Sequence, residues 1–250
     1  MGLSTFRFSN EVLINKTGLL LIVKEINMQV FIVFAHPESQ SFNGALLRTA
    51  IETLNQVGHQ VEISDLYAMK FNPVSGRHNF TSVKEATYFK QQVEEMYATE
   101  TQGFVAEIEM EMQKIERCDL MIWQFPLWWF SVPAILKGWI DRVFVMGRFY
   151  SGGRYDENKT CQGKRALLSL TTGVSKRGFT PEGFNGDIEG ILRPIQRGIL
   201  QFMCFDVLEP HIVYSPDHIS EVQRQAALQA YAQRLQNIAH ETPIPLVLLY

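Results

Sequence analysis

The sequence lacks an apolar run long enough to cross a membrane, because its longest runs fall far short of the roughly 20 residues that a spanning helix needs. It also lacks an excess of basic residues. Lys and Arg number 23 against 26 Asp and Glu, and the net charge of -3 gives no electrostatic footprint for nucleic acid or an anionic membrane. We therefore expect neither an integral membrane segment nor a nucleic-acid partner.

Cysteine is scarce as well. Cys118, Cys161 and Cys204 are odd in number and widely spaced, and the 6 histidines show no metal-ligand spacing. This pattern indicates neither a disulfide framework nor a zinc site, so we expect no metal. A reducing cytoplasm is the localisation that fits these thiols.

Three common motifs are missing. No Gly-x-Gly-x-x-Gly follows the first strand-like run, and no Gly-x-x-x-x-Gly-Lys-Ser/Thr occurs, so a nucleotide would have to be held in another way. No Gly-x-Ser-x-Gly occurs either, which disfavours a hydrolase of the common α/β type.

Residues 1–27 look unlike the rest, and Met28 stands just before a strand-like run. The apolar stretch 19–23 could be the core of a signal peptide, but Lys24 and Glu25 follow it and no small-residue cleavage site comes next. We expect 1–27 to be a non-native or extra N-terminal extension and Met28 to be the natural start. With 250 residues, 46% hydrophobic and 20% charged, the chain has the composition of a single large α/β domain, which we place at 28–250.

From residue 30 on, short apolar runs alternate with helical patterns. The runs predict strands at 30–35, 61–65, 119–125, 165–172 and 207–213. Helical patterns occupy 45–57, 82–117 as one or two helices, 131–143, 188–204 with a bend or break at Pro194, and 219–240. Ser131 is expected to cap its helix, with Pro133 in the first turn. The alternation predicts an α/β fold, a doubly wound five-stranded parallel sheet with helices on both faces.

Three loops, 36–43, 126–130 and 171–187, follow successive strands and should meet at one rim of the sheet. The first offers Ser39, Gln40, Ser41 and Asn43 at a helix amino end, a favourable place for a phosphate, although such residues are often only caps. Its His36 is either structural or a positive neighbour of that phosphate. The second carries three consecutive aromatic residues, which either face a flat ligand or anchor the turn in the core. Together the loops suit a flavin, with its anionic tail and flat ring.

The sequence resembles the NAD(P)H:quinone oxidoreductase (DT-diaphorase) family, whose members have a flavodoxin-like fold. The resemblance covers about residues 29–245 and is carried by a set of motifs: Ala35-His36 with Ser41-Phe42-Asn43, Asp65-Leu-Tyr-Ala-Met69 with Phe71-Asn-Pro73, Gln124-Phe-Pro-Leu127 with Trp129-Phe130, Val132 to Trp139, Thr171-Thr-Gly173, and Val207-Leu-Glu-Pro210.

The resemblance implies two-electron, ping-pong hydride transfer from NAD(P)H to quinones or similar flat acceptors, with FAD as cofactor, FMN as the alternative, and a homodimer with the site between subunits. The implied cofactor-binding residues are His36, Ser41, Phe42, Asn43, Ala45, Pro126, Leu127, Trp128, Trp129, Phe130, Thr171, Thr172, Gly173, Arg224 and Leu228. Arg224 and Leu228 match positions near the adenine end. The implied substrate-binding residues are Trp129, Phe130, Gly173 and Phe202.

The chain departs from the family at several site positions. The relay Tyr and His fall on Phe179 and Asn185, so no catalytic residue is assigned. Val174 replaces the second Gly of the Thr-Thr-Gly-Gly motif, and Trp128 replaces the Gln before the following Trp. Two alternatives follow: an FMN-dependent azo or nitro reductase, and an ancillary flavin-binding subunit of a potassium-efflux transporter.

Overall fold

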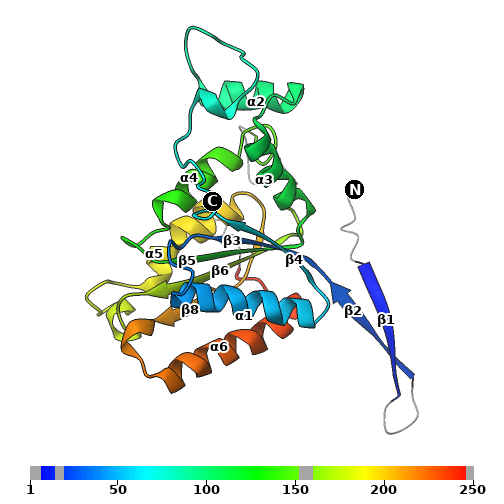
Figure 1. Ribbon diagram of the computed structural model, residues 1–250, viewed down its shortest axis with the longest axis vertical. Helices are drawn as coiled ribbons and strands as arrows, with labels where there is room; N and C mark the ends of the chain where they lie inside the picture. The colour runs from blue at the N-terminus through cyan, green and yellow to red at the C-terminus, as the bar shows by residue number, and fades with distance from the viewer. Residues whose placement is uncertain (1–6, 15–19, 152–159, 246–250) are drawn as a thin grey trace.

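A parallel sheet forms the centre of the molecule (Figure 1). The computed structural model describes residues 7–14, 20–151 and 160–245. The strands lie in the order β4, β3, β5, β6, β7, with β8 also paired to β6, and every neighbouring pair is parallel. They are β3 (Gln29–Phe34), β4 (Gln60–Asp65), β5 (Leu120–Pro126), β6 (Arg165–Thr172), β7 (Asp206–Val207) and β8 (His211–Tyr214). The chain moves to one edge and then returns past its first strand, so the predicted doubly wound, flavodoxin-like fold class is confirmed.

Helices cover both faces of this sheet (Figure 1). One face carries α1 (Phe42–Gln56) and α6 (Glu221–Gln236), and the other carries α3 (Ala106–Arg117), α4 (Ala134–Val143) and α5 (Ile188–Ile195). No helix within the described ranges is long and apolar enough to span a membrane.

The two hydrophobic clusters follow from the alternation of side chains along each strand. Phe31 and Val33 of β3 pack in the cluster that contains Trp139 of α4. Ile32, which lies between them, faces the opposite cluster, to which Tyr231 of α6 also belongs. Because both faces are covered, the central strands read as continuous apolar runs, as expected for parallel strands.

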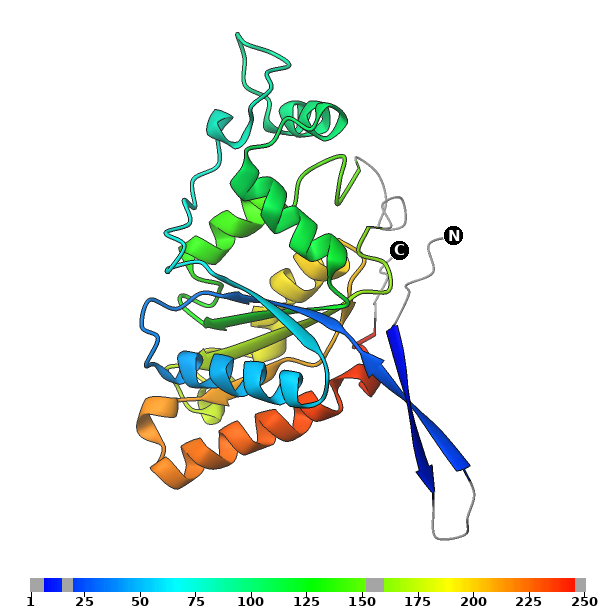
Figure 2. The same ribbon diagram turned by 45° about the vertical axis from the view of Figure 1, so that its right-hand side comes forward.

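Two parts of the chain extend from the sheet and its covering helices (Figure 2). One is the arm formed by residues 77–90 and α2 (Gln91–Thr101). The stretch 82–117, predicted as one or two helices, contains two, α2 and α3, and residues 82–90 lie outside both. The other is a separate antiparallel pair, β1 (Arg7–Ile14) and β2 (Leu20–Asn27). Short 3-10 turns lie at Arg77–Asn79, Lys176–Phe179, Pro216–His218 and Ile238–His240.

Two local predictions are wrong in detail, and a third is confirmed. The strand expected at 207–213 is two short strands, since Pro210 between them has no N–H to continue a ladder. Ser131 does not cap α4: the N-cap is Pro133, and Ser131 instead exchanges two backbone hydrogen bonds with Trp128 at 3.0 and 3.1 Å. The predicted interruption at Pro194 is confirmed, because α5 gives way to a π-helix, η3 (Gln196–Gln201), directly after it.

Candidate functional site

A cavity of about 640 Å³ opens at the carboxyl rim of the sheet. The loops after β3, β5 and β6 meet there because these strands are neighbours and parallel, and Leu127 N–H donates to the Thr171 carbonyl across 2.8 Å. Eleven of the predicted cofactor-binding residues line it: His36, Ser41, Phe42, Asn43, Pro126, Leu127, Trp128, Trp129, Thr171, Thr172 and Gly173. The predicted convergence of the three loops is thus confirmed.

The amino end of α1 supplies the part of the cavity best suited to an anion. Ser41 is the N-cap, and its Oγ accepts from Gly44 N–H at 3.2 Å. Helix geometry leaves the first N–H groups, those of Phe42 and Asn43, without intrahelical acceptors, and the helix dipole favours negative charge beside them. Gly44 is required here, because a Cβ on it would lie 2.0 Å from the Ser39 carbonyl oxygen.

His36 has the structural role that the sequence analysis named as one of two alternatives, and its role beside a phosphate stays a prediction. Its Nδ1 lies 3.0 Å from both the backbone nitrogen and the carbonyl oxygen of Glu38, which fixes the ring, and the ring also lines the cavity. The ring centroid lies 6.0 Å from that of Trp128, so this histidine joins the first loop to the aromatic loop.

A buried chain of amides and a hydroxyl lies beneath the cavity. Asn43 Nδ2 donates to Thr171 Oγ1 at 2.8 Å, and Gln124 Nε2 donates to Asn43 Oδ1 at 2.8 Å. These bonds tie α1, β5 and β6 together. Gln124 Oε1 is buried and has no hydrogen-bond partner within the described residues, so it is a spare acceptor directly below the site.

The aromatic loop faces outward and is not part of the core. Trp128, Trp129 and Phe130 are 42%, 96% and 49% exposed, which contradicts the alternative that they anchor the turn from inside. Trp129 and Phe130 both have left-handed backbones, with φ of 50° and 57°. This conformation is unfavourable for bulky residues and tends to occur at functional sites. The loop therefore presents its rings to the outside of the molecule at the expense of local strain.

Two further lining residues, Pro216 and Asp217, were missed by the sequence analysis. They follow β8, and the rule that ligands bind at the carboxyl ends of strands would have found them. Ser215 holds this segment in place, since its N–H donates to the Thr172 carbonyl at 2.8 Å and its Oγ donates to the Gly173 carbonyl at 3.2 Å. Asp217 adds an exposed carboxylate to a site that is otherwise rich in donors.

Five predicted site residues do not line this cavity: Ala45, Phe130, Arg224, Leu228 and Phe202. Arg224 is close behind it, because its Nη1 donates to the Ile219 carbonyl at 2.8 Å and to the Pro216 carbonyl at 3.3 Å. Phe202 instead packs its ring 6.0 Å from that of Tyr150, in the cluster on the α5 face.

The relay positions are also outside the cavity lining. Phe179 is buried, with its ring 5.9 Å from that of Tyr214, and Asn185 N–H donates to the Gly178 carbonyl at 2.9 Å. Burial, and then the charge of Asp187, raise the pKa of Tyr214, so its phenol stays protonated at neutral pH. In the described part of the chain no group of three or more His, Cys, Asp or Glu is arranged to hold a metal ion.

Comparisons with known proteins agree with this geometry. A sequence profile of the family described as having a flavodoxin-like fold matches residues 28–238. The chain is 43% identical over 218 residues to a ribosyldihydronicotinamide dehydrogenase [quinone] from Pongo abelii, covering 87% of this chain and 94% of that protein. It is 42% identical over 217 residues to NAD(P)H dehydrogenase [quinone] 1 from Cavia porcellus, covering 86% and 79%. A candidate quinone reductase from Klebsiella pneumoniae has a crystal structure that superposes with a TM-score of 0.81 at 38% identity, covering 88% of each chain.

Proposed function

The chain belongs to the family of proteins with a flavodoxin-like fold, and we propose that it is an NAD(P)H-dependent flavoprotein that reduces quinones or similar flat acceptors by two-electron transfer. One observation carries the proposal: a helix amino end that suits phosphate and a pair of exposed indoles share one cavity. The relatives are named as dehydrogenases that act on quinones, which is the same chemistry.

The residues present fit a flavin. The open amino end of α1 suits the anionic tail, and Ser41, Phe42 and Asn43 with His36 would hold it. Ala45 does not line the cavity, because its N–H donates to the Ser41 carbonyl within the helix. A Cβ on Gly173 would meet no protein atom within 4 Å, so the third loop leaves room at the ring edge. Residues 126–130 would hold one side of the ring system, and 171–173 the other edge.

The adenine half distinguishes FAD from FMN. We propose FAD, with Arg224 and Leu228 beside the adenine and the Asp217 carboxylate accepting from sugar hydroxyls. Arg224 supports this through its bonds to the Ile219 and Pro216 carbonyls, which keep the segment carrying Asp217 at the cavity. FMN would leave Arg224 and Leu228 without a ligand.

When bound, a flavin supplies a carrier that takes up and releases two electrons. The protein's own contribution is to hold the reactants in place and to offer donors where negative charge develops. Trp129 offers a face on which nicotinamide and quinone can stack in turn, which is the arrangement that ping-pong transfer requires. The Thr172 hydroxyl donates to the Val174 carbonyl at 2.7 Å and so fixes the loop at the ring edge.

Proton transfer is the step for which this chain is least equipped. Phe179 has no proton to give, and Asn185 can donate a hydrogen bond but cannot exchange a proton near neutral pH. Lys176 and Arg177 are exposed cations in the same loop and could stabilise developing negative charge. We therefore propose that these cations and the Asn185 amide still stabilise the developing negative charge, while the protons come from water.

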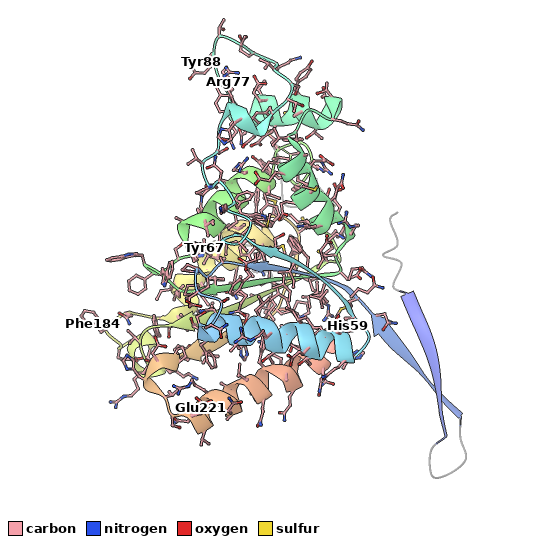
Figure 3. The ribbon with its side chains drawn as sticks, in the orientation of Figure 1. His59, Tyr67, Arg77, Tyr88, Phe184 and Glu221 are labelled. Carbon is pink, nitrogen blue, oxygen red and sulfur yellow. The ribbon has the colours of Figure 1, made fainter. Side chains whose placement is uncertain are left out.

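The complete substrate site requires a second copy of the chain. Phe202 is matched to substrate binding but lies with Tyr150, away from the cavity lining of its own chain. The arm presents exposed apolar side chains, among them Tyr88, which Figure 3 shows beyond α2. We propose a homodimer in which Phe202 of one protomer closes the site of the other.

The remaining assignments follow from this proposal. Residues 28–250 would form one flavin-binding domain, residues 1–27 an addition to it, and the protein would act in the cytoplasm. NAD(P)H is the proposed hydride donor, although one relative is named after ribosyldihydronicotinamide. The azo or nitro reductase and the transporter subunit are the rival functions.

Extraction of the cofactor tests the assignment directly. The purified protein is denatured, and the mass of the released flavin is determined. FAD is expected, together with a dimeric mass for the native protein in solution. Release of FMN would favour the rival function of an azo or nitro reductase. Release of no flavin would overturn the proposed function.

A further inference from the structure

Gln124 of β5 lies below the cofactor cavity but does not line it. Its side chain is on the α1 side of the sheet, where it bonds to Asn43, and the residue is 1% exposed. A buried amide normally has hydrogen bonds at both ends. Here only the nitrogen end is used, because Oε1 has no hydrogen-bond partner among the described residues. The bond that Gln124 keeps is therefore its donation to Asn43.

The buried chain of hydrogen bonds that begins at Gln124 has a direction. Gln124 Nε2 donates to Asn43 Oδ1, and Asn43 Nδ2 donates to Thr171 Oγ1, each across 2.8 Å. Thr171 lines the cavity and is 5% exposed. Its oxygen accepts on the side of Asn43, so its own proton cannot point to Asn43. This proton is available to an acceptor in the cavity.

The opposite direction would give the cavity a different group. If both amides were turned over, Asn43 would donate to the Gln124 oxygen, and the Thr171 hydroxyl would donate to Asn43. Thr171 would then present only lone pairs to a ligand. The direction in the structure presents a donor instead, and the orientation of the Gln124 amide decides which amide atom Asn43 turns toward Thr171.

A donor at this point of the cavity favours a ligand that gains negative charge. Two-electron transfer adds negative charge to the ring system of a flavin, and residues 171–173 are proposed above to hold one edge of that ring system. Donors that are fixed in place before the charge develops stabilise it without further reorganisation. The Thr171 hydroxyl is such a donor, because Asn43 and Gln124 hold its oxygen from below.

We propose that Gln124 is a positioning residue of the cofactor site. Through Asn43 it directs the proton of the Thr171 hydroxyl into the cavity, where this donor stabilises the reduced form of the flavin more than the oxidised form. Gln124 itself does not touch the ligand. The assignment rests on the proposed function, because the flavin is the ligand that gains charge.

The midpoint potential of the bound flavin tests this role without a measurement of activity. It is determined by spectroelectrochemical titration of the flavin-loaded protein. Thr171→Val removes the hydroxyl and keeps the branched shape, so the affinity for reduced flavin relative to oxidised flavin should fall about tenfold. This change equals a potential about 30 mV lower for a two-electron couple. Thr171→Ser retains the donor and should retain the potential.

Gln124→Leu should lower the potential as well, with the affinity ratio reduced about threefold, because Asn43 and Thr171 can then turn either way. In the Thr171→Val background, the same change should add no further shift, since the hydroxyl through which Gln124 acts is gone. Gln196→Leu is the matched control. It replaces another glutamine of low exposure, 9%, which lies in η3, and it should leave the potential unchanged.

Two results would overturn this assignment and leave the proposed function intact. One is a flavin-loaded Thr171→Val protein whose potential is unchanged or higher, as expected if the chain of hydrogen bonds runs in the opposite direction. The other is a Gln124→Leu variant that does not shift the potential, or that shifts it equally in the Thr171→Val background. A wild-type protein that binds no flavin would overturn the proposed function and this assignment together.

Discussion

Replacing Asn43 with Ala should both destabilise the protein and weaken flavin binding. Asn43 is buried, lines the cofactor cavity, and bonds to Thr171 and Gln124 at 2.8 Å each. Truncation removes both hydrogen bonds and leaves the Gln124 amide and the Thr171 hydroxyl without this partner.

The size of the effect follows from these two bonds. An unsatisfied buried polar group costs about 1–3 kcal/mol. Asn43→Ala leaves two such groups, on Gln124 and Thr171, beside the one small void that the truncated side chain leaves, so we expect a loss of roughly 2–4 kcal/mol in the free energy of unfolding. With an m-value of about 2–3 kcal/mol/M, the urea midpoint of the flavin-free protein should fall by roughly 1–2 M. The flavin dissociation constant should rise about tenfold, because one polar contact is lost.

Urea unfolding of the flavin-free protein, followed by circular dichroism, measures the first quantity, and fluorescence quenching of added flavin measures the second. Asn237→Ala, at the exposed end of α6, is the matched control and should change stability by less than about 0.5 kcal/mol. A double-mutant cycle with Gln124→Leu should show coupling of about 0.5–3 kcal/mol. A loss below about 0.5 kcal/mol for Asn43→Ala would refute the role assigned to this buried chain.

Four further predictions follow. Trp129→Ala should raise KM for both NAD(P)H and quinone in steady-state assays, while Tm changes little because this side chain is 96% exposed. The double change Phe179→Tyr with Asn185→His should speed flavin reduction by NAD(P)H in stopped-flow by about tenfold or more, since acid–base catalysis typically contributes about 10²–10⁴-fold. Burial, and then the charge of Arg234, lower the pKa of His211 to about 4. Between pH 4 and 6.5 the unfolded chain therefore binds more protons than the folded one. About 2–3 kcal/mol of the free energy of unfolding should be lost as the pH falls through that window. Deleting residues 1–27 should leave the melting curve and flavin content unchanged.

For each of these predictions, one result would contradict it. Loss of only one of the two activities in Trp129→Ala would exclude a shared stacking face. An unchanged reduction rate in the fully loaded double variant would show that the chemistry does not depend on positions 179 and 185. His211→Phe should flatten the pH profile of stability, and an unaltered profile would assign the dependence to other groups. Aggregation or flavin loss after the deletion would make 1–27 part of the fold.

The sheet could be predicted because its central strands are buried on both faces and read as plain apolar runs, such as 119–125 and 165–172. Prediction failed where one residue overrides a pattern. Pro210 divides a run that is apolar enough for one strand. Ser131 forms two backbone hydrogen bonds with Trp128, and the preference of serine for helix N-caps does not predict this pairing.

The same reasoning applies to the site. The convergence of the three loops follows from strand order alone, whereas the positions of Phe202 and Phe179 depend on side-chain packing with Tyr150 and Tyr214. Asp217 follows β8, a strand of four residues that the sequence analysis predicted as part of one longer strand with β7. For this reason its position at the rim of the sheet was not predicted.

Anaerobic reduction and reoxidation of the bound flavin tests the central proposal most directly. NAD(P)H is added to the purified protein without oxygen, and a quinone follows once the spectrum is constant. The proposed function requires that the oxidised flavin band is bleached by the first addition and restored by the second. A flavin band that stays unchanged in excess NAD(P)H, or a reduced flavin that quinone does not reoxidise, would contradict it.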